Sequence, residues 1–392
     1  MHLTKEEEKM LESGSKPVRK AMELLVRLGD IYGAEEMIEV NSAQASGVSY
    51  KSIGDPGIEF LEGFAEEGAE VKIPTFANPA GMDLERWKEM DVSEEFAEKQ
   101  KRIIKAMKEM GIITTTSCTP YLFGNLPRKN EHIAWAESSA VSFANSVIGA
   151  KTNREGGPSA LSAAITGRTP NYGLHLEKNR KPTHLIEVKT DLETISDFGA
   201  LGSWVGREVE DGKPYFKGIK NAKTDELKSL GAAMAASGAV ALYFVGGITT
   251  DREKPEDLEK IEFTEKEKKE EYQELNQAQD PDLIVFGCPH ASIEEIKEIS
   301  ESLDGETLEK DLWVCTNRAV KSWADRMGYT EKIEESGGKV LCDTCNVVCP
   351  LEDMEYENTG TNSGKAANYL PGFCDQEIIF SDRKKLIKKA IK

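Results

Sequence analysis

The sequence predicts an α/β protein built on parallel sheets, and two observations support that prediction. Short apolar runs of strand length alternate with segments whose apolar residues recur every three to four positions, as in helices. Strands that alternate with helices pair in parallel, and the helices cover both faces of the sheet. The chain of 392 residues, 39% of them hydrophobic, is long enough for two or three domains.

The first segment is predicted to be helical. Thr4 and Glu7 have the spacing of a capping box, and Ser15-Lys16-Pro17 opens a second helix. Gly29 is the expected end of that second helix, because glycine readily adopts the left-handed conformation that ends many helices. Strands are expected next at Met37–Val40 and Val71–Pro74, each followed by a polar loop.

The same alternation continues through the rest of the chain, and most of its strands run into a loop that carries polar residues or a cysteine. Ser292 and Glu295 form a second capping box. The predicted elements are, in order, helix Glu98–Met110, strand Gly111–Thr115, strand His184–Val188, helix Asp225–Ala236, strand Ala239–Val245, strand Leu283–Phe286, helix Ile293–Leu303, strand Leu312–Cys315, helix Arg318–Met327 and strand Val340–Cys342.

Charge and hydropathy exclude several classes of protein. The formal net charge is −19, so the chain lacks the basic surface that binds nucleic acid. The N-terminus lacks the basic and then apolar layout of a signal peptide, and the longest apolar run, Ala239–Val245, is too short to span a bilayer. We therefore expect a cytoplasmic protein without a membrane partner. The highly charged residues 251–275 are a surface helix or a border between subdomains.

The seven cysteines indicate metal ligation, catalysis or buried thiols, because their number is odd and no export signal favours disulfides. Cys118, Cys288 and Cys345 each follow a predicted strand, and ligand sites in α/β proteins lie just past the carboxyl ends of strands. Three thiols from distant parts of the chain suit an iron–sulfur cluster with one iron left open. Such an iron is a Lewis acid, which indicates chemistry on a substrate oxygen.

The local pattern around Cys345 leaves alternatives open. Cys342-x-x-Cys345-x-x-x-Cys349 also suits a redox pair or half of a zinc site, and all three thiols could be structural. We favour Cys345 as the ligand, with Cys342 and Cys349 as buried or auxiliary thiols. The role of Cys374 stays open, and a position inside a strand marks Cys315 as a core residue. His290, beside Cys288, is a candidate to support the site.

Seven segments together carry a resemblance that covers essentially the whole chain. The chain resembles the aconitase X family, which implies an aconitase-like catalytic region of α/β subdomains across residues 1–392. The resemblance also implies a cluster, expected to be [4Fe-4S] with one open iron, on Cys118, Cys288 and Cys345. The segments are Asn41–Ser49, Thr116–Leu122, Trp135–Val141, Phe143–Ser146, Thr152–Ser159, Phe286–His290 and Asp343–Cys345.

The resemblance further implies a hydro-lyase that works with a partner. Family members need a small swivel domain, fused in some relatives and a separate small subunit in others, and this chain is expected to be the separate large subunit. The catalytic base is expected on that small subunit and cannot be assigned here. The implied reaction dehydrates (R)-5-phosphomevalonate to trans-anhydromevalonate 5-phosphate in the archaeal mevalonate pathway. The alternatives are a dehydratase of another hydroxy acid, such as cis-3-hydroxyproline, and a non-catalytic metal-bound scaffold.

Four places are candidates to bind the small anionic substrate. Gly47-Val48-Ser49 offers backbone N–H groups and a hydroxyl, as in an anion nest, and Asn78-Pro79 lies in another loop that follows a strand. Ser142 and Asn145 share a face if that segment is helical, although neighbouring backbone could satisfy both. Lys365 ends a glycine-rich turn that fails the Walker spacing, so we reject nucleotide binding and expect it to pair with a carboxylate or phosphate.

Overall fold

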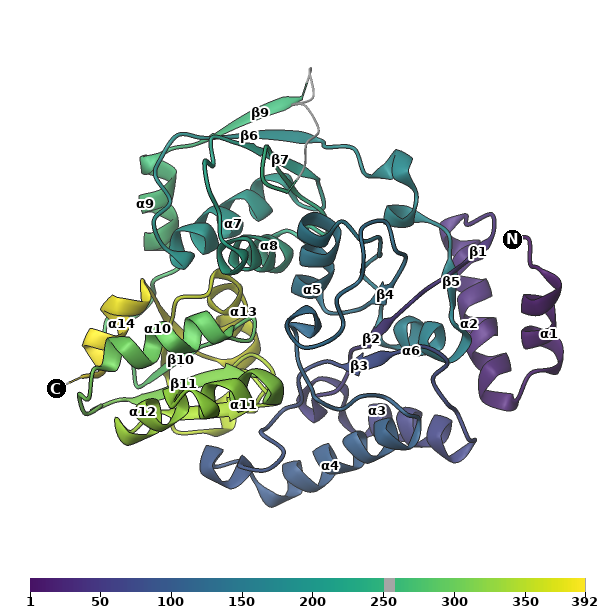
Figure 1. Ribbon diagram of the computed structural model, residues 1–392, viewed down its shortest axis with the longest axis horizontal. Helices are drawn as coiled ribbons and strands as arrows, with labels where there is room; N and C mark the ends of the chain where they lie inside the picture. Colours follow the sequence, from purple (N-terminus) through teal and green to yellow (C-terminus); the bar gives the residue numbers. More distant parts are fainter. Residues whose placement is uncertain (250–257, 392) are drawn as a thin grey trace. The chain divides into compact units, whose positions relative to one another are not determined.

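The computed structural model describes residues 1–249 and 258–391 (Figure 1). The chain divides into two compact units. Unit 1 consists of residues 1–81 and 93–181, and unit 2 of residues 82–92 and 182–392. The short segment Met82–Val92 therefore belongs to unit 2, although the chain on both sides of it belongs to unit 1. Among the described helices, none is long and apolar enough to cross a membrane.

Unit 1 contains a parallel sheet of three very short strands in the order β3-β2-β4, and a separate antiparallel pair, β1 with β5. An isolated bridge between Phe76 and Ile113 extends the parallel sheet. The strands are β1 (Met37–Glu39), β2 (Ala43–Ala45), β3 (Thr75–Ala77), β4 (Ala134–Trp135) and β5 (Arg168–Pro170).

Two strand predictions in unit 1 are wrong. The strand expected at Val71–Pro74 lies instead at Thr75–Ala77, and the one expected at Gly111–Thr115 is reduced to the bridge at Ile113. β2 lies inside a segment that the sequence predicts to be a loop. Strands of two or three residues are too short to give a periodic apolar signal.

The first two helices of unit 1 begin as the sequence predicts, whereas the helix predicted at Glu98–Met110 begins earlier, at Glu94. Thr4 Oγ1 accepts a hydrogen bond from the Glu7 backbone, and the Glu7 carboxylate accepts one from the Thr4 backbone. The predicted end at Gly29 is wrong, because the helix continues to Tyr32 and ends at Gly33, whose φ is 68°. The helices are α1 (Lys5–Ser13), α2 (Lys16–Tyr32), α3 (Tyr50–Glu66), α4 (Glu94–Glu109), α5 (Ser138–Phe143), the π-helix η3 (Ala144–Ile148) and α6 (Gly157–Thr166), with 3₁₀ turns η2 (Pro120–Leu122), η4 (Gly173–His175) and η5 (Glu177–Asn179).

Unit 2 contains a four-stranded parallel sheet in the order β8-β7-β6-β9. Helices α7 and α8 pack closely because glycines of α7 lie against α8: a Cβ at Gly202 would lie 2.4 Å from the Leu230 carbonyl oxygen. The elements are β6 (His184–Val188), α7 (Ile195–Val209), β7 (Pro214–Lys217), α8 (Thr224–Ser237), β8 (Phe244–Val245), β9 (Glu259–Phe263) and α9 (Glu265–Glu274).

The charged segment was expected to be a surface helix or a subdomain border. Its first part falls on residues 250–257, which lie outside the described residues, and its remainder forms β9 and α9 within unit 2. A helix is therefore confirmed for Glu265–Glu274, whereas the strand Glu259–Phe263 is an addition that the charged sequence conceals. The subdomain border predicted within residues 251–275 remains a prediction.

Unit 2 also contains a five-stranded parallel sheet in the order β12-β11-β10-β13-β14, the largest in the described chain. Several predicted elements match it closely, among them strand Leu283–Phe286 and helix Ile293–Leu303 with its capping box. The elements are η1 (Trp87–Met90), β10 (Leu283–Phe286), α10 (Ile293–Leu303), β11 (Asp311–Thr316), α11 (Arg318–Arg326), α12 (Tyr329–Glu335), β12 (Lys339–Cys342), η6 (Leu351–Asp353), β13 (Asn358–Thr361), α13 (Gly364–Cys374), β14 (Glu377–Phe380) and α14 (Arg383–Ala390).

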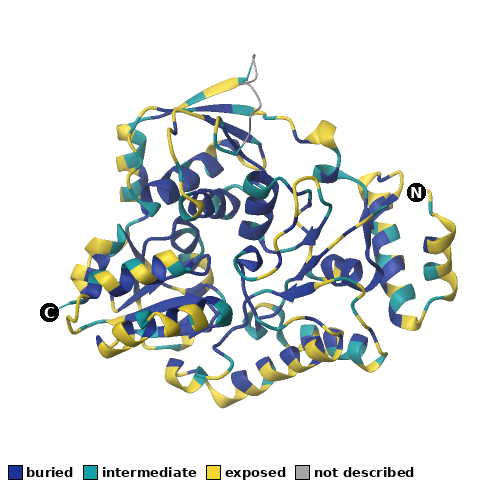
Figure 2. Cartoon of the chain, viewed as in Figure 1, coloured by how far each residue is buried: buried dark blue, intermediate teal, exposed yellow. Residues whose placement is uncertain are grey.

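One hydrophobic core covers a face of this five-stranded sheet. Alternate strand residues such as Ile284 and Phe286 of β10, and Leu312 and Val314 of β11, pack against apolar residues of α10, α11, α12 and α14. Figure 2 shows the buried strands in dark blue and the helices with one buried and one exposed side. The carboxyl ends of β10 and β12 lead directly into Cys288 and Cys345, so this sheet positions two predicted ligands.

Candidate metal centre and substrate loops

The first ligand loop of unit 2 leaves β10 through Gly287 and Cys288. Gly287 has a φ of 96°, and a Cβ there would lie 2.0 Å from the Cys315 carbonyl oxygen, so only glycine fits. The Cys288 carbonyl oxygen accepts a short hydrogen bond from Ser363 Oγ, at the start of α13. Cys288 is buried. The tight fit of Gly287 and the hydrogen bond from Ser363 restrict the conformation of its loop.

The second ligand loop leaves β12 and places Cys345 beside Cys288. The hydrogen bond with Cys288, helped by the nearby charge of Lys365, lowers the pKa of Cys345 to about 7, against the opposing effect of burial. Backbone N–H groups of Val348 and Cys349 donate to the Cys345 carbonyl oxygen at 3.2 and 3.1 Å. The structure thus brings together Cys288, Cys345 and Lys365 of unit 2, three of the residues that the sequence singled out.

Cys349 and Cys374 contact the backbone of the same loop, and Cys342 precedes it. Cys349 Sγ lies 3.6 Å from the Asn346 carbonyl oxygen, and Cys374 Sγ lies 3.5 Å from it. The pKa of the Cys342 thiol is raised, first by burial and then by Asp343 and Asp83, so this thiol stays protonated. These contacts favour Cys345 as the ligand and give the neighbouring thiols structural roles.

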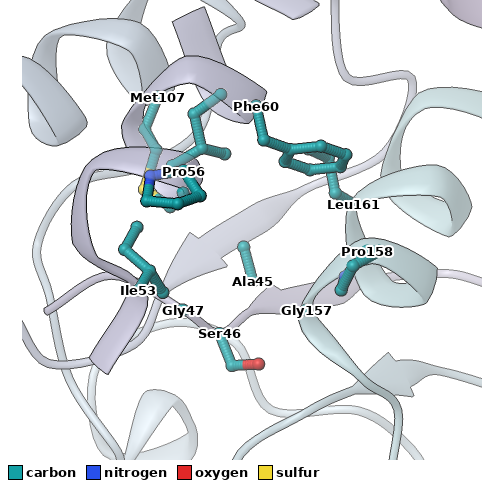
Figure 3. A pocket seen from close by; sticks show the side chains of 12 residues that line it. Ala45, Ser46, Gly47, Ile53, Pro56, Phe60, Met107, Gly157, Pro158 and Leu161 are labelled. Carbon is teal, nitrogen blue, oxygen red and sulfur yellow. The ribbon is translucent and has the colours of Figure 1, made fainter. Parts of the chain in front are cut away.

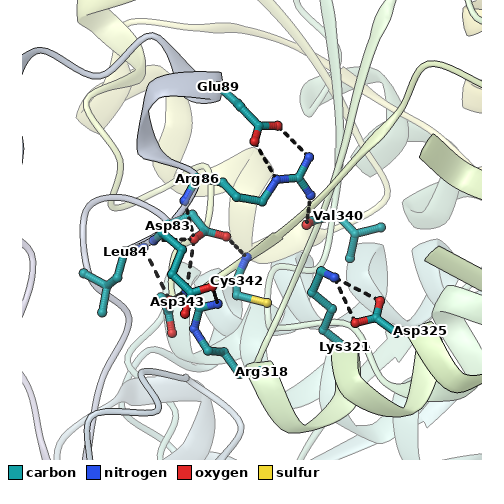
Figure 4. A network of polar contacts seen from close by, with 11 residues as sticks. Asp83, Leu84, Arg86, Glu89, Arg318, Lys321, Asp325, Val340, Cys342 and Asp343 are labelled. Carbon is teal, nitrogen blue, oxygen red and sulfur yellow. Dashed lines mark hydrogen bonds and ion pairs between the residues drawn. The ribbon is translucent and has the colours of Figure 1, made fainter. Parts of the chain in front are cut away.

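A buried ion network fixes the start of the Cys345 loop (Figure 4). Arg318 lies between Asp83, at 3.0 Å, and Asp343, at 2.5 Å, and both carboxylates are buried. Asp83 also accepts the backbone N–H of Cys342 at 2.8 Å. Burial raises the pKa of Asp343 to about 6, although Arg318 opposes that shift. Asp343 has a φ of 66°, so the turn before Cys345 is strained and held by ionic contacts.

The chemistry of this pocket suits a sulfur-bound metal group. Asn346, next to Cys345, is fully buried, and neither its amide nitrogen nor its amide oxygen has a hydrogen-bond partner in the described chain. A buried amide without partners is costly, which is expected where a bound group supplies the partner. The described residues contain no trio of His, Cys, Asp or Glu side chains placed for one metal ion. The ligands of a cluster lie on different irons, so they are spaced more widely than those of a single ion.

The third predicted ligand, Cys118, belongs to unit 1 and is also buried. Its loop is held by side chains: Gln44 Nε2 donates to the Ser117 carbonyl oxygen at 3.1 Å, and Ser117 Oγ accepts from the Thr119 backbone at 3.1 Å. Two of the predicted ligands lie in one unit and the third in the other, so the convergence of all three stays a prediction.

One buried residue that the sequence analysis missed holds both substrate-binding loops predicted in unit 1. Gln100 of α4 accepts from the backbone of Tyr50 at 3.1 Å and of Gly81 at 2.8 Å, and it donates to the Val48 carbonyl oxygen at 2.8 Å. Gly81 has no room for a side chain, because a Cβ would lie 2.7 Å from Ser49 Oγ. The predicted residues on these loops, all in unit 1, are Gly47, Val48, Ser49, Asn78 and Pro79.

The predicted polar face is confirmed as helical, but it changes type part-way. Ser142 lies in α5 and Asn145 in the π-helix η3. Asn145 bonds to both backbone groups of Thr152 and accepts from Arg180 at 2.9 Å, which is a structural use of its amide. Ser142 Oγ and Asn78 Oδ1 are buried atoms without a hydrogen-bond partner in the described chain, as expected of atoms that meet a ligand.

An apolar pocket of about 260 Å³ lies in unit 1 beside the loop that carries Gly47 (Figure 3). Its lining includes Ile53, Phe60 and Leu161, and Ser46 supplies the one oxygen-bearing side chain among the lining residues. Such a pocket suits an apolar group, and it offers no charged partner to a phosphate or carboxylate. The candidate substrate contacts therefore rest on the loops themselves.

Comparisons with known proteins agree with this arrangement. Family models described as aconitase X first, second and third domain match residues 1–178, 182–273 and 281–392. The phosphomevalonate dehydratase large subunit of Methanocaldococcus jannaschii is 56% identical over an alignment of 403 residues, gaps included. The alignment covers 99% of this chain and 100% of that protein. The chain belongs to the aconitase X family.

Other members of the aconitase X family match along nearly the whole chain. The phosphomevalonate dehydratase large subunit of Methanothermobacter thermautotrophicus is 50% identical and covers 99% of this chain and 98% of its own length. The crystal structure of Thermococcus kodakaraensis aconitase X in its holo-form has a TM-score of 0.93 at 48% identity, with full coverage of both chains. The cis-3-hydroxy-L-proline dehydratase of Hypocrea jecorina is 30% identical over 94% of this chain but only 65% of its own length.

Within this aconitase X fold, two supporting residues lacked a clear signal in the sequence. Gln100 lies in a helix whose Glu and Lys residues suggested a solvated surface, so a single buried amide could not be recognised. Asn346 lies between Cys345 and two valines, and a lone polar residue there could equally be a turn residue. A polar side chain directly after a predicted ligand is the one available clue.

Proposed function

We propose that this chain is the large subunit of a hydro-lyase that dehydrates (R)-5-phosphomevalonate to trans-anhydromevalonate 5-phosphate in the mevalonate pathway. The names of the full-length relatives support the reaction and the substrate. The observation within the chain that carries the proposal is the buried Cys288–Cys345 pair, with Lys365 close to it. Such a pair serves metal binding beside an anionic substrate.

The proposed cofactor is a [4Fe-4S] cluster held by Cys118, Cys288 and Cys345. When bound, it supplies a Lewis-acidic iron that lacks a cysteine ligand. The protein's contribution is to keep Cys345 ready as a thiolate, since its pKa is about 7, and to exclude water, because Cys288 and Cys345 are buried. Seven free, buried cysteines suit a reducing compartment, and the cytoplasm is the proposed location.

The proposed substrate contacts are of two kinds: one charged side chain, and several uncharged backbone and side-chain groups. Lys365 is 8% exposed and offers a point charge to the carboxylate or phosphate. Gly47, with a φ of 76°, and its neighbours Val48 and Ser49 offer backbone donors, while Asn78 and Pro79 form the adjoining loop. Ser142 and Asn145 complete the proposed set of substrate-binding residues.

A small subunit is the proposed partner. The relatives named as large subunits imply one, and the hydroxyproline dehydratase relative is longer than the segment it shares with this chain. We assign the catalytic base to that partner, which leaves this chain to bind and orient the substrate. Removal of the proton next to the carboxylate would then require both chains.

The decisive experiment is an anaerobic assay of this chain with its small subunit, with phosphomevalonate and cis-3-hydroxy-L-proline offered separately. We expect dehydration of phosphomevalonate alone, and brown protein that contains iron and sulfide. Cys345→Ser should lose iron and turnover, whereas Cys315→Ser, whose cysteine lies inside β11, should keep both. Turnover of hydroxyproline alone would establish the other substrate, and colourless protein with zinc would establish a structural scaffold.

A further inference from the structure

Besides the contact between Cys288 and Cys345, a hydrogen bond from a histidine joins the two cysteine loops of unit 2. His290 is fully buried, and its Nε2 lies 2.9 Å from the Thr344 carbonyl oxygen. A carbonyl oxygen can only accept, so Nε2 carries the proton. His290 lies two residues after Cys288, and Thr344 directly precedes Cys345. Since β11 separates β10 from β12 in the sheet, this imidazole spans the distance between the two loops.

A buried lysine holds the same histidine from the other side. Lys228 Nζ of α8 lies 3.1 Å from the His290 carbonyl oxygen and 2.9 Å from Asp225 Oδ1, and it makes a shorter contact with Glu295. The Lys228 side chain is 3% exposed. The ammonium group donates hydrogen bonds to the His290 carbonyl oxygen and to Glu295, and Asp225 is its second ion-pair partner. Burial opposes the charge of Lys228, and the two carboxylates more than compensate, so its pKa is raised.

Lys228 and His290 make more contacts than are needed to join helices α8 and α10. The ion pair of Lys228 with Glu295 already links α8 to α10. Lys228 also donates to the His290 carbonyl oxygen in the loop of Cys288, and the imidazole of His290 contacts the loop of Cys345. A continuous series of buried contacts therefore runs from α8 and α10 to both loops.

We propose that Lys228 and His290 are positioning residues that fix the spacing of Cys288 and Cys345 for the iron–sulfur cluster. The inference rests on the proposed function, because it requires that these cysteines bind a cluster. Residues that orient metal ligands raise metal affinity about 10–100-fold through such contacts. Loss of this support should leave the fold in place and weaken the hold on the cluster.

The test compares two variants of His290 in the complex of this chain with its small subunit. The amide nitrogen of glutamine can take the place of Nε2, so His290→Gln keeps the donor to Thr344, whereas the shorter His290→Asn loses it. After anaerobic reconstitution, we expect His290→Asn to lose iron to a chelator about tenfold faster than wild type and to show a changed EPR spectrum. His290→Gln should match wild type in both measurements.

A second variant tests the lysine and guards against misfolding. Lys228→Met with Asp225→Asn removes the cation together with one of its carboxylates, so the net charge of the buried group is unchanged although Glu295 loses its cation. It should show the same faster loss of iron. Arg207→Met is the matched control, because Arg207 pairs with the buried Glu271 elsewhere in unit 2, and its loss should lower thermal stability without changing the EPR spectrum.

The outcomes separate the inference from the proposed function. Iron loss and an EPR spectrum equal to wild type in His290→Asn would overturn the inference while the cluster itself stands. If His290→Asn does not fold, the double variant decides by the same two measurements. Equal losses in His290→Gln and His290→Asn would also overturn it, because only one of them lacks the donor. Wild-type protein that binds no iron would overturn the proposed function.

Discussion

Unit 1 and unit 2 each hold their predicted functional loops with buried polar side chains, but with different chemistry. In unit 1 a neutral amide, Gln100, bonds to three backbone groups of two loops. In unit 2 charged groups do this work, with Arg318 between two carboxylates and Lys228 beside Glu295. A buried ion pair broken on one side leaves an uncompensated charge, whereas a lost amide leaves only unpaired dipoles. The loops of unit 2 should therefore be more sensitive to single substitutions.

The largest effect is expected for Arg318→Met. This change leaves Asp83 and Asp343 buried without their cation, and the free energy of unfolding should fall by about 3–5 kcal/mol. Urea denaturation of the cluster-free chain measures it. Lys321→Met on the same helix removes an exposed ion pair with Asp325 and should cost less than about 1 kcal/mol. Equal effects of the two substitutions would contradict the contrast between the units.

Gln100→Leu should have an intermediate effect in unit 1. Backbone groups of Val48, Tyr50 and Gly81 lose their partner, and the free energy of unfolding should fall by about 1–3 kcal/mol. Faster amide hydrogen exchange at Tyr50 and Gly81 would locate the change. Gln44→Leu is the matched control, because Gln44 is equally buried but makes one such hydrogen bond and has an unpartnered amide oxygen. If Gln44→Leu lowers the free energy of unfolding as much, the burial of the amide, and not the number of its hydrogen bonds, determines the effect.

Asn346→Leu should have the opposite sign. The substitution replaces a buried amide without partners by an apolar group of similar size, so the cluster-free chain should gain roughly 1 kcal/mol of stability. Chemical denaturation without iron tests this, and anaerobic reconstitution should then show weaker retention of iron. A loss of stability in the cluster-free chain would mean that the amide already has partners there.

The smallest effect concerns pH and the buried carboxyl group of Glu155. Burial raises the pKa of Glu155 above its ordinary value of 4.5, although hydroxyl groups of Ser159 and Thr169 donate to it. A raised carboxyl pKa means that the folded state binds the proton more tightly, so the contribution of Glu155 to stability is complete below about pH 4.5 and is lost as pH rises above that value. Glu155→Gln should flatten that decline in urea denaturation series. If Glu155→Gln leaves the slope of stability against pH unchanged, the Glu155 carboxyl does not cause the decline.

The sequence predicted unit 2 better than unit 1, and the reason is physical. β6, β10 and α10 have the predicted bounds because each combines a continuous or periodic apolar pattern with a clear start. The strands of unit 1 have two or three residues, and tertiary contacts rather than local pattern decide where they lie. Helix α7 was missed because its glycines disfavour a helix, although they are what allows the close approach of α8.

The candidate site shows the same division. Cysteines and a lysine after strand ends could be selected from sequence, and Cys288, Cys345 and Lys365 do come together. The residues that hold the functional loops of the two units could not be selected, because Lys228 and Gln100 act through backbone carbonyl and N–H groups that no residue pattern reveals. Lys228 had one clue in hindsight: it is a charged residue in a helix that otherwise turns alanine-rich and apolar.

The segment Met82–Val92 has a consequence for how this protein can be divided or inherited. Unit 2 is not encoded by one uninterrupted stretch of gene, because Asp83 lies 259 residues before the Cys342 amide that it accepts. A recombination or an engineered split after residue 181 would produce a fragment without that carboxylate. On the ribosome, Asp83 emerges long before Cys342 is made, so the turn before Cys345 completes its contacts only near the end of translation.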